Sequence, residues 1–307
     1  MQDDSCKVQR TESPVALAKD LDRPWPCEGM SWVSRAFTGV LDLALVIAAS
    51  AVLAAMLLYV WRLASGPPLW KPSRAAAAGA VAFIVTSFAA WRISKAPRFQ
   101  LLGEPVRRVD TASRVVALTF DDGPDPRYTD EILDVLRTEH VHATFFAIGQ
   151  ELAHHPELGA KIVADGHQLA NHSFTHVRML VRSLDFIRGE IEQTDAEIRR
   201  AGFRGDIQFR PPYGKRLLAL PWVLREMGRR LTLWDLAPDS ADPAIDPAQL
   251  VDRIRDEIQP GSILLLHLMS SAGATSRAAL PAVIHALEGQ GYRFVTVNEL
   301  LAFEPKS

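Results

Sequence analysis

From about residue 105 to the end of the chain, short runs of β-branched and other apolar residues alternate with amphipathic stretches. The apolar runs predict strands at 115–120, 143–147, 168–171, 207–209, 231–234, 263–267 and 294–297. The stretches between them predict helices at 128–139, 157–165, 183–201, 221–227, 247–259 and 276–290. Because strands joined through helices usually pair in parallel, this pattern predicts a mainly parallel sheet, either open or closed into a barrel.

The residues before this region are different in kind. Residues 1–36 are polar, with charges of both signs and three prolines that interrupt a long helix, so we expect a mobile tail there. Two uncharged apolar segments follow, at 43–61 and 75–91. Because about 20 apolar residues cross a bilayer, we expect a membrane anchor over residues 37–98 that contains one or two transmembrane helices. The alternative for the second segment is a helix that lies on the membrane surface or packs against protein.

Charge and cysteine content exclude several kinds of site. The chain has 34 basic and 36 acidic residues and no long block of like charge, so nothing favours nucleic acid as a partner. Its two cysteines, Cys6 and Cys27, both precede the strand-and-helix region, which covers residues 105–307. That region therefore has neither a cysteine nucleophile nor a thiolate metal site.

Two polar clusters follow the first and third predicted strands. Asp121 and Asp122 end the run that begins at Val115, and adjacent carboxylates repel each other unless a cation compensates them. His172 and His176 are four residues apart, a spacing that lets two imidazoles on a helix share one metal. Taken singly, these residues also fit an ordinary turn and surface histidines. Together they favour a metal site of one aspartate and two histidines, with positions left open for water and substrate.

Two further clusters could supply acid–base chemistry. Arg210 precedes two prolines at a strand end, where a guanidinium can hold a carboxylate through a forked hydrogen bond. His267 ends the apolar run at 263–266, and an imidazole titrates near neutrality. Asp239 and Asp242 could orient and tune this histidine. The alternatives are a structural loop with a surface arginine, a histidine of the core, and a helix cap.

In their order and spacing, the motifs TFDDGP, HSFTH, RPPYG, DSAD and LLLH resemble those of the polysaccharide deacetylase family, the NodB-homology carbohydrate esterases. The segments HATFFAIG and GHQLANHSFTH also look like that family, and the likeness covers about residues 110–303. The resemblance implies a distorted (β/α) barrel with about seven parallel strands. The predicted fold class is therefore α/β, with this barrel preceded by one or two transmembrane helices.

The resemblance also implies a metal site and a base. Asp122, His172 and His176 would bind one divalent metal ion, while Asp121 would be the general base and Arg210 would hold it. Oxygen and imidazole ligands make zinc the leading candidate, and they also suit cobalt, nickel, manganese and iron.

The same resemblance assigns the remaining positions. His267 would be the general acid, tuned by Asp239. The backbone N–H of Tyr213 would help bind the oxyanion, and Leu265 would help line a pocket for the acetyl methyl group. This sequence departs from the family where Pro243, rather than Trp, follows Asp242, and where one extra residue lies between Trp234 and this motif. The choice between Asp239 and Asp242 is therefore open at this point.

These features predict a metal-dependent hydrolase that removes N-acetyl groups from a polysaccharide containing N-acetylglucosamine. The alternatives are a deacylase of a lipid-linked or other small acylated sugar, and a catalytically inactive carbohydrate-binding membrane protein. The expected partners are the sugar substrate and the membrane. Acetylated polysaccharides are mostly outside the cytoplasm, so we expect a membrane location with an extracytoplasmic catalytic domain. The positive charges near the two apolar segments slightly favour the opposite orientation for a two-span hairpin, whereas a single span removes this conflict.

Overall fold

The computed structural model describes Ala55, Gly79 and residues 81–88, 104–216, 218–242 and 244–304. The strand-and-helix region contains a five-stranded parallel sheet in the order β3-β2-β1-β4, with β5 also paired to β1. The strands are β1 (Val115–Gly123), β2 (Thr144–Ala147), β3 (Gln168–Asn171), β4 (Ile263–Leu266) and β5 (Arg293–Val295). These five strands lie at the predicted positions.

The other two predicted strands appear only as single-residue bridges. Phe209 pairs with Asn171 at the end of β3 and with Leu231, and Leu236 pairs with Leu264 of β4. The segments around residues 209 and 231–236 therefore link β3 back to β4, so the ring of parallel pairs is closed but irregular.

The side chains of the sheet alternate between two environments, as the pleat of a strand requires. Val116, Leu118 and Phe120 of β1 belong to the apolar cluster that includes residues of the surrounding helices. Val115 and Ala117 belong to a second cluster, inside the ring, with side chains such as Phe146 of β2. Positions 119 and 121 follow the second pattern, so they face the interior.

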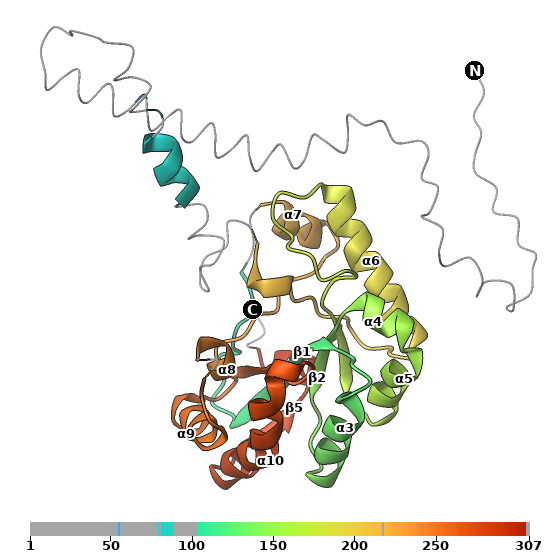
Figure 1. Cartoon of the computed structure of the whole chain (residues 1–307), viewed down its shortest axis with the longest axis vertical. Helices are drawn as coiled ribbons and strands as arrows, with labels where there is room; N and C mark the ends of the chain where they lie inside the picture. The colour runs from blue at the N-terminus through green and yellow to red at the C-terminus, as the bar shows by residue number, and fades with distance from the viewer. Residues whose placement is uncertain are drawn as a thin grey trace, which may run out of the picture.

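Helices cover the outside of the sheet (Figure 1). The helices that match predicted ones are α3 (Thr129–Thr138), α5 (Pro156–Ala164), α6 (Leu184–Arg200), α7 (Ala219–Glu226), α9 (Pro247–Glu257) and α10 (Ala274–Gly289). Shorter helices are α4 (Gly149–His154), α8 (Pro238–Ala241) and α11 (Val297–Leu301). The Ser183 side chain accepts a hydrogen bond from the Phe186 N–H and caps α6, which packs against α7.

The prediction of transmembrane helices before this domain is corrected by the structure. Among the described residues, no helix is long and apolar enough to cross a membrane. Most of 43–61 and 75–91, like the tail at 1–36, lies outside the described residues. The described residues form a parallel-sheet α/β fold, and none of their helices is a membrane span.

A tight turn just before β4 is hydrogen-bonded to the start of β1 and to the segment before β1. Gly261 has a φ of +79°, its N–H donates to the Val115 carbonyl, and its own carbonyl accepts from the Val109 N–H. A Cβ atom placed on Gly261 would lie 1.9 Å from the Val109 carbonyl oxygen. Only glycine fits this position without displacing backbone.

We expect Gly261→Ala to lower the free energy of unfolding by about 3 kcal/mol or more, because it adds a backbone clash to an unfavourable φ. Gly228 is a matched control, since it has a φ of +67° and a Cβ placed on it would meet no atom within 4 Å. Gly228→Ala should cost only about 1–2 kcal/mol. Urea unfolding of the full chain followed by circular dichroism measures both, and equal losses would contradict the argument.

Candidate active site

Asp121 and Asp122 lie at the carboxyl end of β1, where the strand is irregular. Consecutive side chains of a regular strand face opposite sides of a sheet. Here the register shifts between Asp121 and Gly123, and Asp122 has a φ of +71°. As a result, both carboxylates approach His172, whose Nε2 lies 3.7 Å from Asp121 Oδ2 and 3.5 Å from Asp122 Oδ1.

His172 and His176 lie in the loop after β3, and not on a helix as their spacing suggested. Ser173 and His176 both have positive φ angles, and this turn brings the two imidazole rings to 5.0 Å between centroids. Hydrogen bonds hold the turn: Asn171 Oδ1 accepts from the Ser173 N–H, and Ser173 Oγ accepts from the His176 N–H. The buried Glu190 of α6 also accepts the N–H groups of the two residues between them.

The three predicted metal ligands come together. One ligand atom from each of Asp122, His172 and His176 lies within 4.8 Å of the other two, and His176 Nε2 is 3.0 Å from Asp122 Oδ1. His172 Nδ1 is 2.8 Å from the Arg210 carbonyl oxygen, which can only accept, so this nitrogen carries the proton and Nε2 offers its lone pair. This donor set fits a divalent cation that accepts oxygen and imidazole ligands.

The carboxylate of Asp122 is kept ionised. Burial alone would raise its pKa, but hydrogen bonds and favourable charge interactions with His172 and His176 hold the pKa well below the usual range. A charged oxygen ligand beside two imidazoles is what a metal site of this kind requires.

Arg210 holds Asp121 from the interior of the barrel. Its side chain is fully buried, and its Nη1 donates to Asp121 Oδ1 at 2.6 Å and to Thr119 Oγ1 at 3.0 Å. Nη2 donates to the Leu233 carbonyl at 2.9 Å, while the guanidinium carbon lies 3.8 Å from the centre of the Phe146 ring. The second oxygen of Asp121 remains directed toward His172.

His267, just after β4, is paired with Asp239 of α8. Asp239 Oδ2 accepts the His267 N–H at 2.7 Å, and Oδ1 lies 3.4 Å from His267 Nδ1. Burial alone would lower the pKa of His267, but Asp239 and the charges of Asp121 and Asp122 raise it to about 9. Asp242 instead accepts the Ala244 N–H within its own turn. The geometry therefore favours Asp239 over Asp242 as the partner of His267.

The two predicted substrate-binding residues lie at the same end of the barrel. Tyr213 has a φ of +59°, and its ring lies 4.9 Å from the His176 ring. Among the described residues, none accepts a hydrogen bond from the Tyr213 N–H. Leu265 is fully buried and pairs with Thr119, so its side chain faces the interior beneath the site.

Several contacts of this site were not predicted. Thr119 donates to a backbone carbonyl of β4 and accepts from Arg210, and its place two residues before Asp121 on the same strand face was the available signal. Ser240 Oγ lies 3.2 Å from His267 Nδ1, and Ser276 donates to Asp239. Ser276 is distant in sequence, so no local pattern pointed to it.

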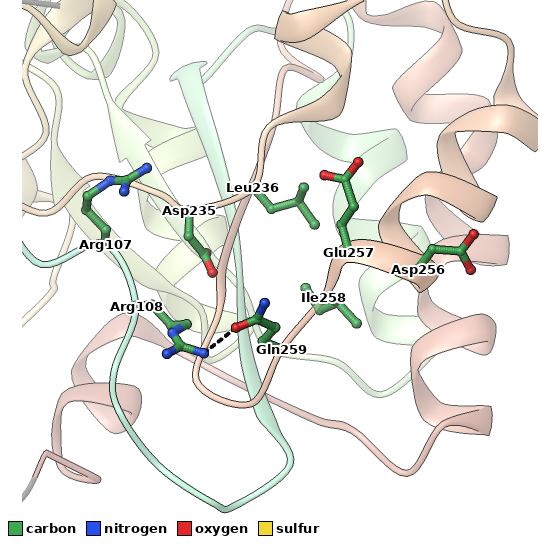
Figure 2. A pocket seen from close by; sticks show the side chains of 8 residues that line it. All are labelled: Arg107, Arg108, Asp235, Leu236, Asp256, Glu257, Ile258 and Gln259. Atoms are coloured by element: carbon green, nitrogen blue, oxygen red, sulfur yellow. Dashed lines mark hydrogen bonds between the residues drawn. The ribbon is translucent and has the colours of Figure 1, made fainter. Parts of the chain in front are cut away.

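A cavity of about 790 Å³ lies elsewhere, near the amino end of β4 (Figure 2). Two of its polar side chains already have partners: Arg108 donates to Gln259, and Asp235 accepts from Ser262 and from the Ile263 N–H. None of the predicted site residues lines it. We therefore place the chemistry at the carboxyl ends of β1, β3 and β4.

Known proteins resemble this chain over the same region. The family model described as polysaccharide deacetylase matches residues 108–232. A peptidoglycan-N-acetylglucosamine deacetylase of Bacillus cereus is 33% identical over 199 residues, which is 64% of this chain and 92% of the relative. A chitooligosaccharide deacetylase of Sinorhizobium fredii is 34% identical over 199 residues, covering 61% of this chain and 92% of the relative.

Solved structures agree with this likeness. A peptidoglycan N-acetylglucosamine deacetylase superposes with a TM-score of 0.60 at 29% identity, covering 64% of this chain and 91% of that one. A CE4 family pseudoenzyme from Bacillus anthracis superposes with a TM-score of 0.59 at 27% identity, covering 67% of this chain and 72% of that one.

A parallel α/β fold with paired carboxylates, two histidines and a further imidazole gathered at one end of its sheet defines a hydrolase. Within that class, the chain belongs to the polysaccharide deacetylase family and is a carbohydrate N-deacetylase. The resemblance drawn from the motifs is thus confirmed.

If His267 acts as an acid, activity is present while it is protonated and is lost as the pH rises through its pKa. Asp239→Asn removes the negative charge that favours the protonated form. We expect the alkaline limb of the kcat/KM profile to move to lower pH by about one to two units. Asp242→Asn is the matched control and should leave this limb in place. A shift in the Asp242 variant alone would reverse the assignment.

Proposed function

We propose that this chain is a metal-dependent hydrolase that removes N-acetyl groups from a polysaccharide containing N-acetylglucosamine. The observation that carries the proposal is the position of Asp121: its carboxylate is fixed by Arg210 and lies 3.7 Å from a nitrogen of the Asp122, His172 and His176 cluster. A base held beside three ligands is the arrangement that hydrolysis of an amide requires.

Five residues serve the attack of water on the acetyl group. Asp122, His172 and His176 would hold a divalent cation, which would supply a Lewis acid that lowers the pKa of water and polarises a carbonyl group. Asp121 accepts the proton of the attacking water. Because Arg210 occupies the other oxygen of this carboxylate, Asp121 stays in place and its free oxygen faces the cluster.

The leaving amine needs a proton, since an amine anion is a poor leaving group. His267 donates that proton to the sugar nitrogen as the C–N bond breaks, and Asp239 stabilises the protonated imidazole beforehand. The Tyr213 N–H donates to the developing oxyanion. The products are acetate and a free amino sugar.

The choice of substrate is supported by what the relatives are named for. Two of them are deacetylases of peptidoglycan N-acetylglucosamine and of chitooligosaccharide, both of which contain N-acetylglucosamine. Because such polymers are mostly outside the cytoplasm, we also propose an extracytoplasmic position for the domain. A reporter fused after Ser307 that is active only outside the cytoplasm tests this, and a cytoplasmic result would contradict it.

Acetate release from acetylated chito-oligosaccharides by the full chain is the direct test of function. Stripping divalent metal should abolish release, and adding back zinc or another metal of the same class should restore it. Peptidoglycan strands and lipid-linked acetylated sugars belong in the same panel. Absence of release from every substrate with every metal would contradict the proposed function.

Substitutions should distinguish the proposed metal ligands from the proposed base. His172→Ala should lower the metal content of the protein, measured by elemental analysis, because it removes one of three ligands. His285, an exposed histidine of α10, is the control, and His285→Ala should keep the metal. Unchanged metal content in the His172 variant would exclude it as a ligand.

Asp121→Asn should keep the metal and lose turnover by about 10³-fold, because the amide cannot accept the proton of water. Since this change also removes the counterion of Arg210, circular dichroism must show that the variant is folded. A folded, metal-loaded variant with parental turnover would exclude Asp121 as the base.

A further inference from the structure

The loop between His176 and α6 carries positive charge at the edge of the candidate active site. Residues 177–183 include Arg178 and Arg182 and contain no acidic residue. Arg178 is exposed, and its guanidinium carbon lies 5.0 Å from the centre of the Tyr213 ring. That ring is 55% exposed and lies 4.9 Å from the ring of His176. Two ring contacts therefore connect Arg178 to a metal ligand.

The charge of Arg178 is not used within the described part of the protein. No carboxylate of the described residues forms an ion pair with Arg178 or with Arg182, which lies over the Phe186 ring at 5.2 Å. A nearby arginine behaves differently: Arg188 of α6 pairs with Glu226 of α7 at 2.6 Å. Arg178 thus keeps its full charge at the rim of the site.

The N–H groups of Arg178 are available to bind an anion. Its contact with the Tyr213 ring is a cation–π contact, and among the described residues none accepts a hydrogen bond from the planar fork of its guanidinium. That fork matches a carboxylate, which it can bind through two parallel hydrogen bonds. Tyr213 holds the guanidinium, so less side-chain freedom is lost on binding.

We propose that Arg178 is a specificity-determining residue that binds a carboxylate on a sugar unit next to the N-acetyl group removed. The substrate class is then an N-acetylated glycan that carries carboxylates, such as a strand containing muramic acid, rather than a neutral chitin-like chain. This inference rests on the proposed deacetylase function and names its substrate more closely. Asp121 is already paired with Arg210, and a cation held by Asp122, His172 and His176 would offset the charge of Asp122.

The test compares one glycan with and without its carboxylates. Peptide-free strands of alternating N-acetylglucosamine and N-acetylmuramic acid serve as the acidic substrate, and the same strands with carboxyl groups reduced to alcohols serve as the neutral one. For the metal-loaded full chain, we expect kcat/KM for acetate release to favour the acidic strand. In Arg178→Gln this ratio should fall by about tenfold, mainly through KM, and Arg178→Lys should restore part of it. Salt should also reduce the ratio in the parent.

Arg293→Gln is the matched control. Arg293 is an exposed arginine at the start of β5, at the other end of the strands, so the same charge is removed far from the site. The control should keep the parental ratio. An equal fall for both substrates in Arg178→Gln would show that Arg178 only orders Tyr213, and would overturn the proposal, as would an unchanged ratio.

Binding of the two strands measured by calorimetry separates this inference from the proposed function. The parent could release no acetate yet bind the acidic strand more tightly than the neutral strand, with this difference in affinity lost in Arg178→Gln. In that case the proposed function would fail and the inference would stand. Equal binding of both strands by the parent would overturn the inference whatever the turnover.

Discussion

The buried ion pair of Arg210 and Asp121 is the interaction on which the rest of the site depends. Arg210 comes from the segment after Phe209 and reaches across the interior to Thr119 and Asp121 of β1 and to the carbonyl of Leu233. It therefore connects segments of the barrel that are joined elsewhere only by single bridges. Burying two charges is costly, and removing one partner from such a pair typically costs about 3–5 kcal/mol. An apolar pair of similar size would stabilise the barrel as well, so the ion pair is better explained by its effect on the Asp121 carboxylate.

The backbone contributes as much to the site as the side chains do. Asp122, Ser173, His176 and Tyr213 all have positive φ angles, and they are four of the six such non-glycine residues in the described part of the chain. Each departs from the conformation that its residue type prefers, at a cost of about 1–3 kcal/mol. At Asp122, the irregular strand end directs the carboxylates of Asp121 and Asp122 toward His172. The backbone strain is thus concentrated where the proposed metal ligands and the proposed base converge.

A structural feature could be predicted from the sequence when the interactions that cause it are local in the chain. The five strands of the sheet and the grouping of polar residues at their ends follow from apolar runs and parallel pairing, so they were predictable. The histidine spacing suggested a helix, but Asn171, Ser173 and Glu190 stabilise a turn through contacts that span up to 16 residues. Likewise, the apolar residues 207–209 and 231–234 predicted strands, yet these segments pair only at single positions. They lie beside the buried Arg210 side chain, which donates to the Leu233 carbonyl. The apolar segments before the domain matched a membrane span by composition, but among the described residues no helix is long and apolar enough to cross a membrane.

Strand ends and loops carry different parts of the site, which explains how this fold can act on several glycans. Phe120 pairs with Leu266, so Asp121 and His267 follow paired positions at the ends of neighbouring strands. The sheet therefore sets the positions of the two residues proposed to transfer protons. By contrast, Arg178, Tyr213 and Ser240 lie on loops or short helical turns that are not part of the sheet, and their side chains are exposed. Relatives that share about a third of their residues with this chain are named for peptidoglycan and for chitooligosaccharide. Such a range is expected if the strand ends retain the chemistry while the loops around them change the sugar that is bound.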